Sequence, residues 1–303
     1  MNIVTAILDV LAPRHCLVCG RILGVNESHL CLHCDSDIPL TWSWTHERNP
    51  IADAFNEALA AMSASEAGVC DPSDGMAALG RDTPKIPGFS GTPLSNPSRG
   101  PKSLDFGKDS SEGAYRTEGS QTPASGIIPA VYFRAAALMY YREGDGYRNI
   151  LRALKYDGDI RAGRKYSRML GKFLSSGGLY SDVDLVVPVP LHWRRLLSRG
   201  YNQSAVIARE IARSLNATYA PSVLRRTRRT TSQVHRTFSE RSRNVLDAFS
   251  AGKIPPTTRH ILIVDDTFTT GSTLAACTLA LLKALPADSG IRISVVTLAK
   301  VDN

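Results

Sequence analysis

Two adjacent carboxylates follow a short apolar run near the C-terminal end of the chain. Residues 261–264, Ile-Leu-Ile-Val, are typical of a buried strand, and Asp265 and Asp266 come directly after them. Residues 267–273, TFTTGST, then supply several hydroxyl groups and a glycine. A helix expected to start near Ser272 would point its first N–H groups and the positive end of its dipole at this loop. The sequence therefore predicts an anion-binding loop.

The two carboxylates need a different ligand group, because carboxylates repel phosphate but accept hydrogen bonds from sugar hydroxyls. Asp265 and Asp266 beside an anion loop therefore favour a ribose phosphate. The simpler alternative is that the Asp, Thr and Ser residues only cap a helix. A Rossmann site is excluded because the chain has no G-x-G-x-x-G, and a Walker loop is excluded because it has no G-K-[ST].

Arginine-rich segments follow two further predicted strands. Arg194, Arg195 and Arg199 come after the apolar strand 184–190, and guanidinium groups make bidentate hydrogen bonds with phosphate oxygens. We expect them to bind a diphosphate or another polyanion; the alternative is a solvated basic turn. The stretch 225–243 holds seven Arg and one Glu, a charge density that predicts a mobile segment unless an anion is bound.

Four cysteines form two tight pairs near the N-terminal end. Cys16-x-x-Cys19 and Cys31-x-x-Cys34 are separated by eleven residues, which is the spacing of a tetrahedral zinc ribbon. Four thiolates complete the coordination of Zn²⁺, so we expect a structural rather than a catalytic metal. Three neighbouring histidines are alternative sources of one ligand: His15, His29 and His33.

Apolar runs alternate with amphipathic helical patterns through the second half of the chain. Runs that are apolar throughout predict a parallel sheet covered by helices on both faces, with ligands bound at the carboxyl ends of the strands. The expected strands are 184–190, 217–224, 260–266 and 292–299. The expected helices are 147–156, 163–175, 202–215 and 272–285. Residues 127–141 fit either a strand or a helix.

Composition limits the classes of partner. The chain has 303 residues, a formal net charge of +8 and a pI of about 9.3, so it suits anionic partners such as phosphates or nucleic acid. No run reaches the roughly 18 apolar residues that a membrane-spanning helix needs. The start of the chain lacks a basic region typical of a signal peptide. We therefore expect a cytoplasmic protein without membrane insertion.

Composition also divides the chain. In residues 71–126, 25 of 56 residues are Gly, Ser or Pro and few are large and apolar, so burial cannot offset the entropy of ordering them. The predicted parts are an N-terminal helix and zinc ribbon at 1–62, a disordered Gly/Ser/Pro-rich insertion at 63–126, and an α/β domain at 127–303.

The apolar run, the two acids and the T-T-G-S-T loop resemble the site for 5-phosphoribosyl 1-diphosphate (PRPP) in type I phosphoribosyltransferases. The resemblance implies that Asp265 and Asp266 hold the ribose hydroxyls at the catalytic centre, that the loop holds the 5′-phosphate, and that Mg²⁺ accompanies PRPP. It also implies that 225–243 is a flexible hood over the reaction centre. The residues so implied to bind PRPP are Thr267, Thr269, Thr270, Gly271, Ser272 and Thr273.

A wider set of motifs is similar to the ComF (ComF/GntX-like) family of competence proteins. The motifs are L-K-Y-D-G at 154–158, V-P-V-P-L at 187–191, R-G-Y-N-Q at 199–203, T-x-x-Q at 230–233 and E-R-S-R-N at 240–244, together with the cysteine pairs. The resemblance covers the cysteine module and about 127–300. It implies a phosphoribosyltransferase-like domain preceded by a zinc ribbon, and a link to uptake or processing of single-stranded DNA in natural transformation.

Two functions from different classes follow. The first is a glycosyltransferase that moves phosphoribose from PRPP, or from another ribose phosphate, to an acceptor that the sequence does not identify. The second is a non-catalytic component of the competence machinery that binds single-stranded DNA and keeps an inherited phosphate pocket. The arginine-rich stretch suits either one, because arginine binds the phosphates of nucleic acids without reading their sequence.

Overall fold

The computed structural model describes residues 13–66, 132–142, 144–226, 248–286 and 288–302. The described residues all belong to one compact unit, which is separate from residues 70–126. This unit is described below. The expected N-terminal helix, most of the expected disordered insertion and most of the arginine-rich stretch lie outside the described residues.

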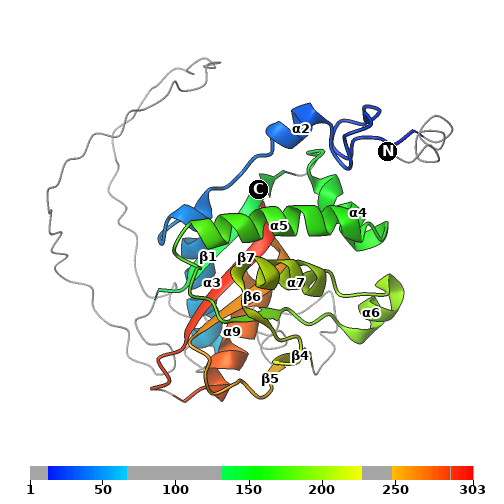
Figure 1. Cartoon of the computed structure of the whole chain (residues 1–303). Helices are drawn as coiled ribbons and strands as arrows, with labels where there is room; N and C mark the ends of the chain where they lie inside the picture. Colours follow the sequence, from blue (N-terminus) through cyan, green and yellow to red (C-terminus); the bar gives the residue numbers. More distant parts are fainter. Residues whose placement is uncertain (1–12, 67–131, 143, 227–247, 287, 303) are drawn as a thin grey trace, which may run out of the picture. The chain divides into compact units, whose positions relative to one another are not determined.

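A parallel sheet is the centre of this unit, as the sequence predicts (Figure 1). Its five strands lie in the order β1-β7-β6-β2-β3, and each pair of neighbours is parallel. The ambiguous segment 127–141 contributes a strand at one edge. The strands are β1 (Arg134–Tyr141), β2 (Leu185–Pro188), β3 (Thr218–Tyr219), β6 (His260–Phe268) and β7 (Arg292–Val301).

Helices cover both faces of the sheet (Figure 1). One face carries α4 (Arg148–Tyr156), α5 (Ile160–Ser176) and α7 (Gln203–Leu215), and the other carries α3 (Pro50–Glu66) and α9 (Ser272–Ala284). Successive side chains of a strand point to opposite faces, so β6 is buried on both sides and reads as a continuous apolar run. No helix in the described part of the chain has the length and apolarity to cross a bilayer.

The order of the strands creates a crevice between β2 and β6. The chain leaves β2 through α7 on one face and continues to β3, whereas it leaves the adjacent strand β6 through α9 on the opposite face and continues to β7. The two connections therefore diverge at the carboxyl ends of β2 and β6. Such a switch point is where parallel α/β sheets bind ligands.

The prediction of one continuous strand over 217–224 is wrong. Ala220 still donates its N–H to Val186 O (2.9 Å), but Pro221 then starts a turn, because proline has no N–H for the sheet. The chain continues as β4 (Leu224–Arg226), which pairs antiparallel with β5 (Phe249–Ala251) in a separate two-stranded sheet. In this pair Arg226 lies opposite Phe249.

A short helix, α6 (Trp193–Arg199), occupies the segment that follows β2, where the sequence predicts an arginine cluster but no helix. His192 caps it, because its Nδ1 accepts a hydrogen bond from the Arg194 N–H (3.2 Å). Gly200 ends it in the left-handed region at φ 76°. None of its side chains is buried, so the helix projects from the sheet.

The cysteine module comes before α3 in the chain and contains two short helical segments. These are α2 (Leu32–Ser36) and the 3₁₀ turn η1 (Ser43–Thr45). Ser43 is buried and its Oγ accepts a hydrogen bond from the Ala137 N–H of β1 (3.0 Å). Leu40 also forms an isolated bridge with Met139 of β1. The module is thereby joined directly to the edge strand of the sheet.

A buried histidine ties together the amino-terminal edge of the sheet. His260 is fully buried, with Nδ1 2.8 Å from Asp182 Oδ1 and Nε2 2.8 Å from Ser294 Oγ. Asp182 also accepts a hydrogen bond from Arg292. Burial lowers the pKa of His260 below its usual value, although the Asp182 carboxylate opposes this shift. The ring is therefore neutral near pH 7.

This burial predicts a loss of stability in mild acid. The unfolded chain protonates His260 near pH 6.5, whereas the folded chain does so only at lower pH. The free energy of unfolding should therefore decrease below about pH 6.5, by at most about 1.4 kcal/mol per pH unit for this group. Urea unfolding between pH 7.5 and 5.5 should show a shallower dependence for His260→Gln than for wild type. Equal slopes would contradict the assignment.

Candidate functional site

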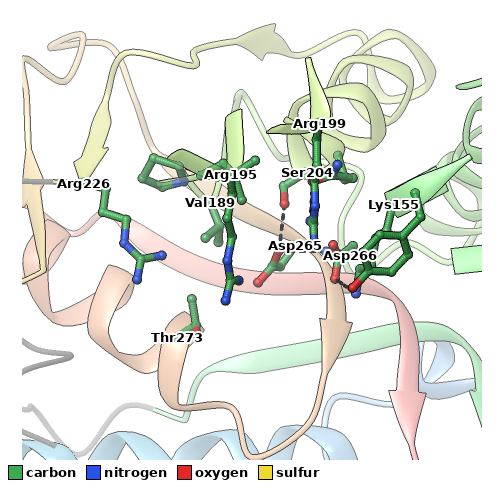
Figure 2. Close-up of a pocket in the computed structure, with 13 residues that line it drawn as sticks. Lys155, Val189, Arg195, Arg199, Ser204, Arg226, Asp265, Asp266 and Thr273 are labelled. Carbon is green, nitrogen blue, oxygen red and sulfur yellow. Dashed lines mark hydrogen bonds and ion pairs between the residues drawn. The ribbon is translucent and has the colours of Figure 1, made fainter. Parts of the chain in front are cut away.

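A pocket of about 420 Å³ lies at the carboxyl ends of β2 and β6, in the crevice between them (Figure 2). Val189, Pro190 and Leu191, which follow β2, form one side, and the acid pair of β6 forms another. Residues from α4, α6, α7, α9 and β4 complete the lining. Segments that are distant in sequence therefore converge at the edge predicted to bind ligands.

The acid pair lies within β6 and not after its end. The sequence predicts a strand that ends with the acids, at residue 266, but β6 continues to Phe268, because Asp265 and Thr267 still pair with Thr297 and Ala299 of β7. Pairing with β7 fixes the backbone of both acids. Their side chains are therefore presented from a rigid strand.

Hydrogen bonds hold the Asp265 carboxylate from two directions. Its Oδ1 accepts from Ser204 Oγ (2.7 Å) and from the backbone N–H of Asp266 (2.8 Å). Ser204 is placed by the start of α7, where Asn202 Oδ1 accepts from the Ser204 N–H (3.1 Å) and Asn202 Nδ2 donates to Val189 O (3.0 Å). The R-G-Y-N-Q segment is thereby attached to the end of β2.

Lys155 neutralises the second acid. Its Nζ lies 2.9 Å from Asp266 Oδ1 and donates to Thr267 Oγ1 at 3.1 Å. Lys155 stands in the last turn of α4, and Gly158 (φ 67°) then turns the chain toward α5. Asp159 caps α5 by accepting from the Ala162 N–H (3.1 Å). The L-K-Y-D-G motif thus supplies both a cation and the turn that positions it.

The proximity of the two carboxyls changes their ionisation. Burial and the negative charge of Asp266 raise the pKa of Asp265 to about 7, against the opposing effect of its hydrogen bonds with Ser204 and with the Asp266 N–H. The pair therefore carries less than two full negative charges near neutral pH. Such a pair can both accept and donate hydrogen bonds, which suits the hydroxyl groups of a sugar.

The loop after β6 leaves the start of α9 open. Gly271 adopts a left-handed conformation (φ 77°) as the residue before the helix, and a Cβ at this position would lie 2.9 Å from the Phe268 ring. No side chain in the described part of the chain caps α9. The described residues therefore do not show the capped helix start of the simpler interpretation, and among them the first N–H groups of this 13-residue helix have no side-chain cap.

The predicted loop residues take different places. Thr273, in the first turn of α9, lines the pocket with the acids. Thr267 accepts the hydrogen bond from Lys155. Thr270 Oγ1 and Ser272 Oγ lie 2.9 Å apart at the helix start. Thr269 and Gly271 belong to the same bend, but neither one lines the pocket as the structure has it.

Only two of the three predicted arginines face the pocket. Arg195 and Arg199 are four residues apart on α6, so they lie on one face of the helix and both line the pocket. Arg199 Nη1 donates to Gln203 Oε1 (3.0 Å). Arg194 points elsewhere, with its guanidinium 5.3 Å from the centre of the Trp193 ring. Adjacent residues of a helix point in different directions, so Arg194 and Arg195 lie on different sides of α6 although they are neighbours in sequence.

Eight of the 13 described lining residues were not predicted as site residues, among them Lys155, Gln203, Ser204 and Arg226. Lys155 and Gln203 belong to motifs noted only for the family resemblance, Arg226 belongs to the arginine-rich stretch 225–243, and Ser204 carried no separate signal. Gln203 is 1% exposed, and its Nε2 has no hydrogen-bond partner within the described part of the chain. A buried amide donor without a partner is costly. It is therefore available to a ligand in the pocket.

The charges of the lining favour a polyanion. Lys155, Arg195, Arg199 and Arg226 bring four cationic side chains to one pocket that contains two carboxyls (Figure 2). Burial and the nearby Arg195 lower the pKa of Arg226, which is the expected effect of placing like charges together. An anionic ligand would relieve this repulsion. The pocket is therefore suited to phosphate groups.

The four cysteines form the metal-ligating group that their spacing predicts. Their Sγ atoms all lie within 4.8 Å of one another, and those of Cys19 and Cys31 are 3.7 Å apart. Tetrahedral zinc with Zn–S bonds of about 2.3 Å requires S–S separations of about 3.8 Å. The donor set fits such an ion. The histidines beside the cysteines are not in the group, and His29 instead pairs with Asp159 (3.1 Å).

The cysteine module is attached to the helices that form the site. Tyr147, the residue before α4, donates its hydroxyl to Cys34 O (3.0 Å) and to Asp37 O (2.8 Å). Lys165 of α5 forms an ion pair with Asp35 (2.7 Å). The metal-ligating group therefore supports α4, the helix that carries Lys155.

Comparison with known proteins gives relatives but no matching family model. The chain is 39% identical over 100 residues to the DNA utilization protein YhgH of Escherichia coli K12, and 38% identical to that of Salmonella typhimurium LT2, over 33% of this chain and 44% of each relative. It is 33% identical over 93 residues to Competence protein F of Haemophilus influenzae, over 30% and 41% of the two chains. These relatives support the resemblance of the chain to the ComF family of competence proteins.

The match spans less than half of the length of these relatives. Three of the motifs that carry the resemblance meet at the pocket: L-K-Y-D-G through Lys155, V-P-V-P-L through Val189, Pro190 and Leu191, and R-G-Y-N-Q through Arg199 and Gln203. The T-x-x-Q and E-R-S-R-N motifs lie outside the described residues.

The geometry of the cysteine module predicts one metal ion per chain. Cys31→Ser should lose that ion and lower the melting temperature, because the module would no longer support α4. Cys277→Ala is the matched control, since Cys277 is fully buried in α9 and is not in the metal-ligating group. Elemental analysis and thermal unfolding would measure both effects. Full metal retention in Cys31→Ser would contradict four-thiolate coordination.

Proposed function

We propose that the pocket binds PRPP with Mg²⁺ and that the chain transfers phosphoribose to an acceptor with loss of diphosphate. One observation carries the proposal: an acid pair suited to sugar hydroxyls lies in one pocket with Thr273 of the uncapped helix start and with several cations (Figure 2). A ribose phosphate with a second anionic group has hydroxyls for the acid pair, a phosphate for the helix start and a further anionic group for the cations.

Each part of the proposed donor has a partner of suitable chemistry. The start of α9, with Thr273, would bind the 5′-phosphate through backbone N–H groups. Asp265 and Asp266 would accept hydrogen bonds from the ribose hydroxyls. Arg195 and Arg199 would bind the diphosphate. Mg²⁺ bound with the substrate would neutralise part of the charge of the diphosphate.

The proposed step forms one bond and breaks another. A lone pair of the acceptor bonds to ribose C1, and the C1–O bond breaks so that diphosphate leaves with the electron pair. The acceptor then releases its proton to solvent. Positive charge develops on the ribose ring during this step, so the carboxylates beside it stabilise the transition state, and the arginines stabilise the leaving group.

The names of the relatives supply the cellular context of the proposal. They refer to DNA utilization and to competence. We infer that this chain also acts in bacterial DNA uptake or use, in the cytoplasm. We further infer that the cysteine group holds structural Zn²⁺, because four thiolates leave no open coordination position for chemistry.

A second candidate is binding of single-stranded DNA without catalysis. The observation that favours it is a pair of exposed aromatic rings beside the pocket: Trp193 and Tyr156 are 57% and 70% exposed. Arg194 lies 5.3 Å from the first ring and Arg199 lies 5.2 Å from the second. Exposed aromatic rings with adjacent cations bind the bases and phosphates of single strands.

Calorimetric titration separates the two candidates. We expect PRPP with Mg²⁺ to bind in the micromolar range, and the double variant Asp265→Asn with Asp266→Asn to abolish the heat of binding. Arg195→Ala should weaken binding by about tenfold or more, because it removes a charge-assisted hydrogen bond. Arg194→Ala is the matched control, since this neighbour does not line the pocket, and should bind PRPP as wild type does.

The opposite pattern would support the second candidate. Binding of a single-stranded oligonucleotide that is weakened by Arg194→Ala, together with no detectable binding of PRPP, would show that the pocket does not hold this donor. Loss of PRPP binding in both arginine variants would mean that the effect is not specific to the pocket.

A further inference from the structure

A second cavity adjoins the pocket and shares a wall with it. This cavity has a volume of about 480 Å³ and is lined by Tyr141, Arg148, Leu151, Arg152, Lys155 and Tyr156. The last two residues also line the first pocket. The two spaces are therefore neighbours on either side of the end of α4.

The second cavity lies at the same edge of the sheet as the first. Tyr141 is the last residue of β1, and the other lining residues belong to α4. Because β1 is two strands from β6 in the sheet, the two strand ends are roughly 10 Å apart. That separation suits two small molecules held side by side.

The lining of the cavity has a distinct chemistry. Arg148, Arg152 and Lys155 are cationic, Tyr141 and Tyr156 supply aromatic rings, and no carboxyl is among its described lining residues. The buried Leu151 adds an apolar surface. Aromatic rings favour a flat ligand, and guanidinium groups favour an anionic group on it.

We propose that this cavity is the acceptor site and that it takes a small planar aromatic molecule with an anionic group. The proposal rests on the proposed function, because an acceptor has meaning only beside a bound donor. The anionic group would lie against Arg152, and the ring against the tyrosines. The nucleophilic atom would then point past Lys155 toward the acid pair.

The position of Lys155 supports this arrangement. Lys155 and Thr273 lie on opposite sides of the acid pair (Figure 2), and Lys155 Nζ is 2.9 Å from Asp266. A ribose held by the acids with its 5′-phosphate at Thr273 would direct its other end toward Lys155. Lys155 is also part of the lining of the proposed acceptor cavity.

The shared wall is held in place by contacts from other elements. The Arg199 guanidinium lies 5.2 Å from the centre of the Tyr156 ring, which joins α6 to α4. Tyr201 donates its hydroxyl to Leu154 O, one residue before Lys155. The end of α4 therefore fixes the two cavities relative to each other, and the reaction requires the nucleophilic atom to reach ribose C1 past Lys155.

Fluorescence titration of the full chain with 2-aminobenzoate tests the proposal. This probe is planar, carries one carboxylate and has a nucleophilic amine, whereas aniline is its matched neutral counterpart. In the presence of PRPP and Mg²⁺ we expect saturable binding of 2-aminobenzoate and at least tenfold weaker binding of aniline. Arg152→Ala should weaken binding of 2-aminobenzoate about tenfold or more and should leave the affinity for PRPP unchanged.

Arg161→Ala is the control variant, because Arg161 is an exposed arginine of α5 that lines neither cavity. It should bind both compounds as wild type does. Unchanged binding of PRPP also shows that Arg152→Ala is folded.

Two outcomes would overturn the proposal, and they can be distinguished. If PRPP binds but 2-aminobenzoate does not, or binds independently of Arg152, the acceptor site is wrong and the donor site stands. If PRPP does not bind while 2-aminobenzoate binds through Arg152, the proposed function fails. The cavity then loses its role as an acceptor site.

Discussion

Two carboxyl groups stand side by side near the end of a strand that is buried on both faces. Their mutual repulsion and their removal from water are both unfavourable, so the fold must compensate them. The compensation comes from two other elements: Lys155 of α4 pairs with Asp266, and Ser204 of α7 hydrogen-bonds Asp265. The positions of α4 and α7 at this edge are therefore tied to the acids.

The contacts that hold α4 and α7 in place extend to other parts of the unit. Asn202 attaches the start of α7 to the end of β2, and Tyr147 attaches the start of α4 to the cysteine module. A module far from the pocket in sequence thus contributes to the position of Lys155. The repulsion and the loss of hydration of the two carboxyls are not fully compensated, because the pKa of Asp265 stays near 7. Groups with strongly shifted pKa values are concentrated at functional sites.

The sequence predicts this site best where its parts are neighbours along the chain. The strand, the acids and the loop of β6 lie within fourteen consecutive residues, 261–274, and the four cysteines lie within nineteen, 16–34, so motif spacing finds both. Lys155 and Ser204 are not predicted from the sequence, because they reach the acids only through tertiary packing. Arg194 and Arg195 look equivalent in sequence, but the unexpected helix α6 turns only one of them into the pocket.

The small hairpin of β4 and β5 has a consequence for how this site can change. Arg226, on the pocket lining, lies opposite Phe249, so the end of β4 and the start of β5 are neighbours. The ends of the intervening stretch are held by the hairpin itself. Doubling the length of a stretch closed in this way costs only about 0.6 kcal/mol. The length of that stretch can therefore change in evolution with little effect on the stability of the sheet.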